Sequence, residues 1–269
     1  MRGRIIDLHT PRIMGILNVT PDSFYDGGRF ADERSVLGQV EKMLKEGASF
    51  IDVGGYSSRP GAENIPEEQE LKRSVNAVKL IIEKFPEAII SIDSFRSNVV
   101  RAAVQEGASM VNDISGGELD PEMFQTVGSL GVPYILMHMR GNPQNMAQLA
   151  EYTNLVKEIT DYFHPRIFEL QQKHVKDIII DPGFGFAKTR EQNFELLNHL
   201  GDFGILEKPL LVGLSRKSMV WKTLNISAEE ALNGTTALNT VALLKGADIL
   251  RVHDVKEAVE VVMLCKALT

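Results

Sequence analysis

The chain has only one cysteine, Cys265, among its 269 residues, so it can form neither an intrachain disulfide nor a cysteine metal cluster. Such scarcity is typical of proteins in a reducing compartment. No run approaches the roughly 20 consecutive apolar residues of a membrane span. The N-terminus, MRGRIIDLHT, lacks the apolar core of a signal peptide. We therefore expect a cytoplasmic protein that does not enter a membrane.

An excess of positive charge is also missing. The 29 Lys and Arg residues are outnumbered by 36 Asp and Glu residues, which gives a formal net charge of −7. This balance argues against general nucleic-acid binding, which favours a basic surface. It also means that an anionic substrate must be held by a local cluster of Lys and Arg, against the overall field.

What the sequence does contain is a short apolar run with a polar ending, repeated about eight times. The runs cover residues 13–20, 50–55, 89–94, 110–115, 133–139, 177–183, 209–215 and 247–254. Runs that are apolar on both faces and alternate with helical patterns indicate parallel βαβ units. We predict a single (β/α)8 TIM barrel over residues 1–269, a length typical of this fold. A short N-terminal strand or hairpin at residues 4–8 is expected to close the barrel floor.

Helical patterns separate these runs. They are expected near residues 32–46, 66–85, 98–106, 122–129, 152–173, 191–200, 228–245 and 256–268. Asp254 and Glu257 have the spacing of a capping box for the last helix.

The polar endings are informative because active sites of TIM barrels lie at the C-terminal ends of the strands. The residues concerned are Asn18, Asp52, Asp93, Asn112, His138, Asp181, Ser215, Arg251 and His253. Asp181 follows the apolar residues 178–180 directly, where a buried unpaired carboxylate would be too unfavourable to serve packing alone. The alternative is that Asp181 only caps the turn that it begins, as Asp often does.

Seven segments of the sequence resemble dihydropteroate synthases, in the order that this family has them. They are MGILNVTPDSF, DVGGYSSRPGA, MVNDISGG, MHMRGNP, DPGFGFAK, LVGLSRKS and LRVHDV, and the resemblance covers nearly the whole chain. It implies an enzyme that joins a dihydropterin, carried as its methylene diphosphate, to the amine of 4-aminobenzoate. Dihydropteroate and diphosphate would be released. It also implies a Mg²⁺ cofactor and a homodimer, for which residues 228–245 offer a plausible face.

A carboxylate suits the amino-pyrimidinone edge of a pterin, because charge-assisted hydrogen bonds are the strong ones. Asp181 is the first candidate for that contact. The other candidates for the pterin site are Asp93, Asn112, Met137, Phe186, Gly213 and Lys217.

A diphosphate leaving group needs cations and amide donors. The candidates are Ser58, Arg59, Arg251 and His253, with Asn18 as an oxygen ligand to Mg²⁺. Arg251 and His253 are two residues apart on a strand, so their side chains point the same way. The alternatives are an ion pair between Arg251 and a carboxylate, and a buried, hydrogen-bonded His253. Asp93, Lys217, Arg251 and His253 are the residues expected to take part in catalysis.

The carboxylate of 4-aminobenzoate also needs an anion site. Ser215 and Arg216 are the candidates, at the possible start of a helix whose N–H groups favour anions. Phe24 and Pro60 would pack on the benzoate ring. The aromatic amine is neutral near pH 7 and needs no strong general base, so we expect an SN1-like transfer in which diphosphate leaves first.

Three other kinds of protein remain alternatives: a pterin-binding methyltransferase barrel, a non-catalytic pterin-binding paralogue, and an aldolase-type barrel that uses Lys217 as a Schiff-base lysine. Asn18, Arg59, Arg251 and the loop after residue 214 argue against the first. The sequence also departs from the commonest family pattern. Tyr56 stands where many relatives have Glu, Ser58 replaces Thr, and Ser-Phe-Arg at 94–96 replaces Thr-x-Lys.

Overall fold

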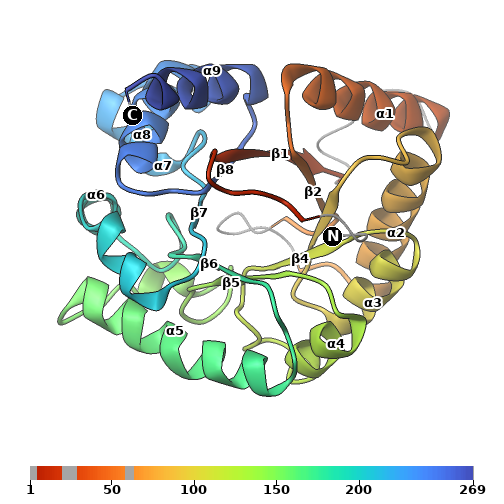
Figure 1. Ribbon diagram of the computed structural model, residues 1–269, viewed down its shortest axis with the longest axis horizontal. Helices are drawn as coiled ribbons and strands as arrows, with labels where there is room; N and C mark the ends of the chain where they lie inside the picture. The colour runs from red at the N-terminus through yellow and green to blue at the C-terminus, as the bar shows by residue number, and fades with distance from the viewer. Residues whose placement is uncertain (1–4, 20–28, 58–63, 269) are drawn as a thin grey trace.

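Eight parallel strands form a ring at the centre of the molecule (Figure 1). The computed structural model describes residues 5–19, 29–57 and 64–268. The strands are β1 (Arg12–Asn18), β2 (Phe50–Gly54), β3 (Ile90–Asp93), β4 (Met110–Asp113), β5 (Tyr134–Met137), β6 (Ile178–Asp181), β7 (Leu211–Val212) and β8 (Ile249–Val252). Their order is β6-β5-β4-β3-β2-β1-β8-β7, and a bridge between Ile180 and Leu210 joins the two ends. The predicted (β/α)8 barrel is confirmed.

Helices surround the strands on all sides (Figure 1). They are α1 (Arg29–Glu46), α2 (Glu67–Lys84), α3 (Ser97–Gln105), α4 (Met123–Leu130), α5 (Leu155–Gln172), α6 (Arg190–Asn198), α7 (Ser218–Leu224), α8 (Leu232–Leu244) and α9 (Val255–Lys266), with the 3-10 helices η2 (Met146–Gln148) and η3 (Leu200–Leu206). Apolar side chains between helices and strands make the largest core cluster. Each fully buried aliphatic or aromatic side chain there stabilises the fold by about 1.5–3 kcal/mol.

One layer of side chains inside the barrel seals its N-terminal end. Its members are Met14, Phe50, Met110, Ile135, Ile179, Leu211 and Ile249. Side chains two residues apart on a strand point to the same side. The residues two positions beyond six of these members therefore face the interior above the layer: Asp52, Asn112, Met137, Asp181, Gly213 and Arg251. Strand alternation thus directs the candidate site residues toward the C-terminal mouth of the barrel.

The N-terminal segment closes the floor as expected, but not as a strand. Residues 5–8 have no regular secondary structure. Ile6 and Leu8 nevertheless pack against the sealing layer. A cavity of about 450 Å³ at this end lies between Ile5, Ile6 and Leu8 and the starts of several strands. The strand prediction for this segment was wrong. Its apolar side chains pack against the sealing layer, but its backbone does not pair with a strand.

The predicted capping box of helix α9 is also wrong. Asp254 precedes the helix but makes no side-chain cap hydrogen bond. Its two carboxylate oxygens instead accept bonds from Arg216 Nε and Nη2, at 2.9 and 2.8 Å. A capping box does form at helix α6, between Thr189 and Gln192.

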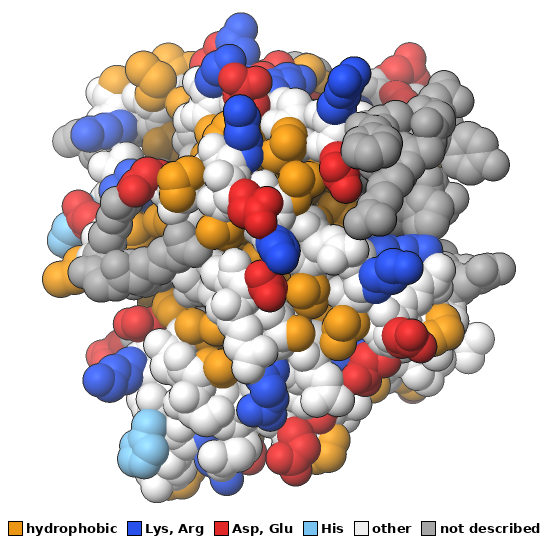
Figure 2. Space-filling model, turned by 90° about the vertical axis from the view of Figure 1, so that its right-hand side faces the viewer, with side chains coloured by type: hydrophobic (Ala, Val, Ile, Leu, Met, Phe, Trp, Pro, Cys, Tyr) orange, Lys and Arg blue, Asp and Glu red, His pale blue; other side chains and the backbone are white. Residues whose placement is uncertain are grey.

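Charges of both signs are interspersed on the face shown in Figure 2. On helix α1, for example, Lys45 pairs with Glu41 at 2.7 Å and Lys42 with Glu46 at 3.9 Å. Such exposed pairs contribute little to stability. None of the helices in the described ranges is long and apolar enough to cross a membrane.

Candidate active site

Arg251 joins two carboxylates at the mouth of the barrel. Its Nε donates to Asp52 Oδ2 at 2.6 Å, and its Nη2 donates to Asp93 Oδ2 at 2.6 Å. Asn112 Nδ2 donates to the same Asp52 oxygen at 2.9 Å. The side chain of Asp52 is fully buried, and that of Arg251 is 21% exposed. Since a buried charge requires a partner, these four residues from β2, β3, β4 and β8 form one paired polar layer.

This layer sets the charge states of its members. Burial opposes the charge of Arg251, but Asp52 and Asp93 outweigh it and raise the pKa of the guanidinium. Burial also raises the pKa of Asp93 to about 7; Arg251 opposes this rise, and the carboxylates of Asp52, Glu70 and Asp113 add to it. Asp93 therefore lies close to the balance between its neutral and charged forms at neutral pH.

The ion-pair alternative for Arg251 is therefore present in the structure. It does not make Arg251 inaccessible, because part of the guanidinium side chain remains exposed. Asp52 is one of the polar strand endings in the sequence, but no role in the site was predicted for it. Its position two residues beyond Phe50 could have predicted that role, because it directs the side chain inward beside Asp93.

Asn18 and Asp93 lie on either side of Gly54. The three residues are aligned across β1, β2 and β3. A Cβ at Gly54 would lie 3.5 Å from Asp93 Oδ2 and 3.7 Å from Asn18 Oδ1. The absence of a side chain at 54 thus leaves two oxygen-bearing side chains facing a common space.

Asp181 is buried at the end of β6. Its Oδ1 accepts the backbone N–H of Gly183 at 2.7 Å. The turn-capping alternative is therefore present too, and it occupies one carboxylate oxygen. Burial raises the pKa of Asp181, although Lys217, the Gly183 bond, Arg251 and Lys188 all favour the charged form.

Lys217 approaches Asp181 from the loop after β7. Its ammonium donates to the carbonyl of Phe184 and lies 4.8 Å from the centre of the Phe186 ring. Burial lowers the pKa of Lys217 to about 8, although Asp181 opposes that change. A Cβ at Gly213 would lie 3.9 Å from Lys217 Nζ and 3.9 Å from Arg251 Cβ. Gly213 therefore leaves room beside the Lys217 ammonium and the base of the Arg251 side chain.

Apolar side chains complete this part of the mouth. Met137 belongs to a small buried cluster with Ile114, Met139, Met146 and Ala187, against which Phe95 and Phe186 pack. The structure thus brings together the residues predicted for a pterin site: Asp93, Asn112, Met137, Asp181, Phe186, Gly213 and Lys217. They come from five strands and their following loops.

Ser215 and His253 are also in contact. Ser215 Oγ lies 3.0 Å from His253 Nδ1 and accepts the backbone N–H of His253 at 3.1 Å. Arg216, the neighbouring candidate, pairs with Asp254 and donates to the carbonyl of Glu229 at 2.8 Å. Helix α7 begins at Ser218, directly after this loop.

Four predicted residues cannot be placed. Phe24, Ser58, Arg59 and Pro60 lie outside the described residues. Within the described ranges, no group of three or more His, Cys, Asp or Glu residues could hold a metal ion. Asn18 therefore remains the candidate metal ligand.

Two of the three departures from the family pattern, Tyr56 and the segment 94–96, are in contact with each other. The ring of Tyr56 meets that of Phe95 edge-on at 5.0 Å, and the guanidinium of Arg96 lies 5.5 and 5.2 Å from the two ring centres. Arg96 pairs with buried Glu70 at 2.8 Å. Gln144 Nε2 donates to the Tyr56 hydroxyl at 2.9 Å. Tyr56 and residues 94–96 therefore form one cluster of contacting side chains. The sequence alone presents them as separate changes.

Comparison with known proteins agrees with this geometry. Residues 14–253 match the pterin-binding enzyme family. The dihydropteroate synthase of Escherichia coli (strain K12) is 40% identical over 268 residues, which are 99% of this chain and 94% of that protein.

Solved structures are similar as well. The dihydropteroate synthase of Yersinia pestis, in complex with a sulfonamide drug, has a TM-score of 0.93 and 39% identity, covering 99% of this chain and 97% of that chain. That of Xanthomonas albilineans, with 4-aminobenzoic acid, has a TM-score of 0.92 and 37% identity, covering 99% and 96%. The chain therefore belongs to the dihydropteroate synthase family of pterin-binding enzymes.

Proposed function

We propose that the enzyme transfers the methylene of 6-hydroxymethyl-7,8-dihydropterin diphosphate to the amine of 4-aminobenzoate, giving 7,8-dihydropteroate and diphosphate. The observation that carries this proposal is the convergence of Asp181, Lys217, Asp93 and Arg251 at one end of the barrel. Two carboxylates and two cations there can serve a neutral, hydrogen-bonding ring and an anionic leaving group together.

The pterin is proposed to lie between Met137 and Phe186 and to meet a polar edge. Asp181 accepts from the amino-pyrimidinone N–H groups, Asn112 adds amide contacts, and Lys217 donates to the ring carbonyl or a ring nitrogen. Lys217 is a fitting donor because its pKa of about 8 keeps it largely charged at neutral pH.

Arg251 and His253 are proposed to bind the diphosphate, with Ser58 and Arg59 from the second loop. Arg251 holds two carboxylates already, so it can turn one donor toward the diphosphate while Asp52 keeps the other. A proton on Asp93, whose pKa is about 7, would reduce the charge that Arg251 leaves behind.

A Mg²⁺ ion is proposed to bind beside Gly54, where the side-chain oxygens of Asn18 and Asp93 face each other. Asn18 Oδ1 would hold it, since oxygen is the donor that Mg²⁺ prefers and the ion usually keeps waters and substrate phosphates as its other ligands. When bound, the ion supplies positive charge to the diphosphate. Loss of diphosphate leaves a cation delocalised into the pterin ring, for which the carboxylate of Asp52 offers negative charge nearby. The neutral amine of 4-aminobenzoate then adds to this cation through its lone pair, and the proton that it loses passes to the released diphosphate or to water, so no strong base is needed.

The 4-aminobenzoate is proposed to bind near Ser215 and Arg216, with Phe24 and Pro60 on its ring. Arg216 can receive the carboxylate only beside or in exchange for Asp254, because its Nε and Nη2 both already donate to that residue. The strength of this subsite therefore depends on how the two carboxylates share one guanidinium.

The enzyme is further proposed to be a homodimer through helix α8. The helix, LNGTTALNTVALL, has no charged residue, and charged residues are depleted in the cores of protein interfaces. Leu244 at its end is 61% exposed, and Leu224 at the end of α7 is 50% exposed. A second copy would cover them, and sedimentation equilibrium tests this: Leu244→Glu is expected to give monomers, and an unchanged mass would refute the proposed face.

Product analysis tests the proposed reaction. The dihydropterin diphosphate and Mg²⁺ are supplied with and without 4-aminobenzoate, and diphosphate and dihydropteroate are both measured. Stoichiometric release of the two products is expected. A folded protein that binds pterin but forms no dihydropteroate would favour the paralogue or methyltransferase alternative. Trapping of a pterin adduct bonded to the enzyme would contradict the SN1-like order.

A further inference from the structure

The turn after β6 is held mainly by side chains from outside it. Residues 182–187 form neither strand nor helix. Gly183, Gly185 and Ala187 have positive φ angles of 74°, 79° and 47°. An L-residue in this left-handed region is unfavourable by about 1–2 kcal/mol, so Ala187 needs external contacts to stay there.

Lys188 binds the turn through two backbone carbonyls and binds His138 through a third contact, all from one atom. Its Nζ lies 3.0 Å from the carbonyl of Gly183, 3.1 Å from that of Phe186 and 3.0 Å from His138 Nδ1. An ammonium has three N–H donors, which match these three acceptors. A neutral amine would keep two donors for the carbonyls and accept from His138 instead. The two carbonyl contacts therefore exist in either protonation state.

His138 gives this amine a rigid support. The imidazole is buried at the end of β5 and meets the ring of Tyr162 edge-on at 4.7 Å. The His138 carbonyl lies so close to Gly183 that a Cβ there would be 2.0 Å away. Burial lowers the pKa of His138 well below its usual value, with smaller effects from Lys188, Arg140 and Arg166. The ring is therefore neutral and can accept from Lys188.

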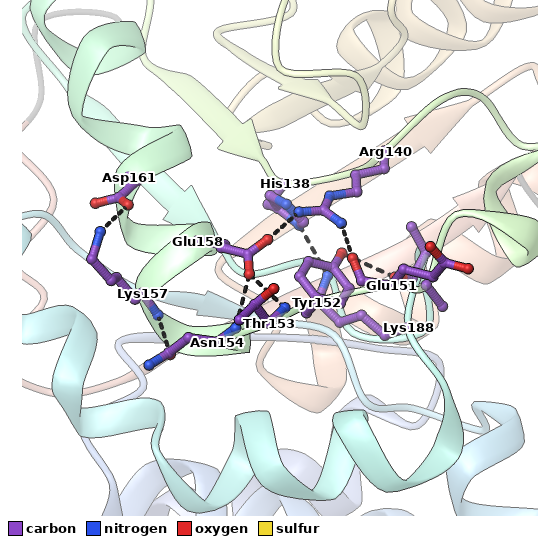
Figure 3. Close-up of polar contacts among 12 residues, drawn as sticks. His138, Arg140, Glu151, Tyr152, Thr153, Asn154, Lys157, Glu158, Asp161 and Lys188 are labelled. Atoms are coloured by element: carbon purple, nitrogen blue, oxygen red, sulfur yellow. Dashed lines mark hydrogen bonds and ion pairs between the residues drawn. The ribbon is translucent and has the colours of Figure 1, made fainter.

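Tyr152 holds the far end of the same turn. Its hydroxyl donates to the carbonyl of Ala187 at 3.0 Å. The guanidinium of Arg140 lies 3.9 Å from the centre of the Tyr152 ring and pairs with Glu158 at 2.6 Å. Figure 3 shows His138, Arg140, Tyr152 and Lys188 gathered at this place, with Glu158 beside them and joined to Arg140.

We propose that Lys188 is a positioning residue for the pterin pocket: its amine fixes the turn after β6 so that Asp181, Phe186 and the Phe184 carbonyl that binds Lys217 face the barrel mouth. The pterin part rests on the proposed function. Gly183 connects the two, because its carbonyl binds Lys188 and its N–H binds Asp181. Lys188 touches no proposed substrate atom and acts through these groups.

Hydrogen exchange of the ligand-free protein tests the positioning directly. Three amides of the turn are hydrogen-bonded, those of Gly183, Gly185 and Phe186. In Lys188→Met we expect them to exchange at least tenfold faster than in wild type. The matched control is Lys176→Met, an exposed lysine just before the same strand, which should leave these rates unchanged.

Steady-state kinetics test the consequence. Lys188→Met should raise the KM for the pterin diphosphate at least tenfold and leave the KM for 4-aminobenzoate within twofold. Lys188→Arg should rescue this only in part, because a planar guanidinium cannot donate to three converging acceptors from one atom. Tyr152→Phe, which loses one hydroxyl, should shift both measurements in the same direction by a smaller factor.

Two kinds of failure can be told apart. The inference would be overturned if Lys188→Met had the same exchange rates and the same pterin KM as Lys176→Met. If Lys188→Met does not fold, Tyr152→Phe replaces it in the test. Amide exchange rates of the turn that are unchanged in Tyr152→Phe would also overturn the inference. A wild-type protein that makes no dihydropteroate would overturn the proposed function, while the exchange rates would still decide whether Lys188 positions the turn.

Discussion

Replacing Arg251 with methionine removes the cation between Asp52 and Asp93 but keeps an unbranched apolar stem. The fully buried carboxylate of Asp52 then loses a 2.6 Å ion pair and keeps only its bond from Asn112. Removing one partner of a buried ion pair typically destabilises a protein by about 3–5 kcal/mol. In a protein of this size each kcal/mol shifts Tm by about 2–4 °C. Tm is therefore expected to fall by about 6–20 °C near pH 8.

The loss should be smaller in acid. Burial already raises the pKa of Asp93 to about 7 with Arg251 present, against 3.8 for an ordinary Asp, and removing the cation raises it further. The folded state therefore binds a proton more tightly than the unfolded state, and stability falls as pH rises from about 4 through the folded pKa. At pH 5.5 Asp93 is protonated in the variant, so less uncompensated charge remains.

Calorimetry of wild type and Arg251→Met at pH 5.5 and pH 8 measures both effects. Lys256→Met is the control, because Lys256 pairs with Glu260 at 4.0 Å on the exposed face of α9, and it should not change Tm measurably. Two results would contradict the account of this buried layer. One is a Tm of Arg251→Met equal to that of wild type at both pH values, and the other is a fall in Tm of the same size at both.

Three further changes have definite expectations. Gly183→Ala would place a Cβ 2.0 Å from the His138 carbonyl, so we expect a large drop in Tm, and a Tm near that of wild type would contradict the close approach. Ala187→Gly relieves a φ of 47° and should raise the free energy of unfolding, measured by urea denaturation, by about 1 kcal/mol. A lower free energy of unfolding would count against strain at this residue. Because the pKa of Lys217 is about 8, the pterin KM should rise above that pH in wild type, and it should stay level to a higher pH in Lys217→Arg; identical pH profiles would exclude Lys217 as the charged group.

The barrel was predictable because its signals are local. Apolar runs with polar endings located each strand, and alternation by two residues directed Asp181 and Arg251 to the same end. The resemblance to a family then gave roles that no spacing could supply. The residues 5–8 show the limit: an apolar pattern also fits an irregular segment whose side chains seal the floor.

Partners that are distant in sequence were not predictable. The pairing of Arg251 with Asp52 and Asp93 depends on the register of β8 against strands about 160–200 positions earlier. Asp254 was assigned to the cap of its own helix because Arg216, its actual partner, lies 38 positions away. Lys188 is the last residue of the family segment DPGFGFAK, yet its role depends on His138, which lies 50 positions earlier, directly after β5.

The measurement that tests the central claim most directly is the affinity of the protein for a 6-hydroxymethyl pterin, by calorimetry, in wild type, Asp181→Asn and Asp177→Asn. Asparagine at 181 can still accept the Gly183 N–H, so this change keeps the turn and replaces the other carboxylate oxygen with an uncharged amide donor. Asp177 is exposed at the opposite end of the same strand. Asp181→Asn should weaken binding at least tenfold, since a hydrogen bond to a charged group is worth about 1.5–3 kcal/mol, and Asp177→Asn should have no effect. Equal affinity in all three proteins would contradict a pterin site at this end of the barrel.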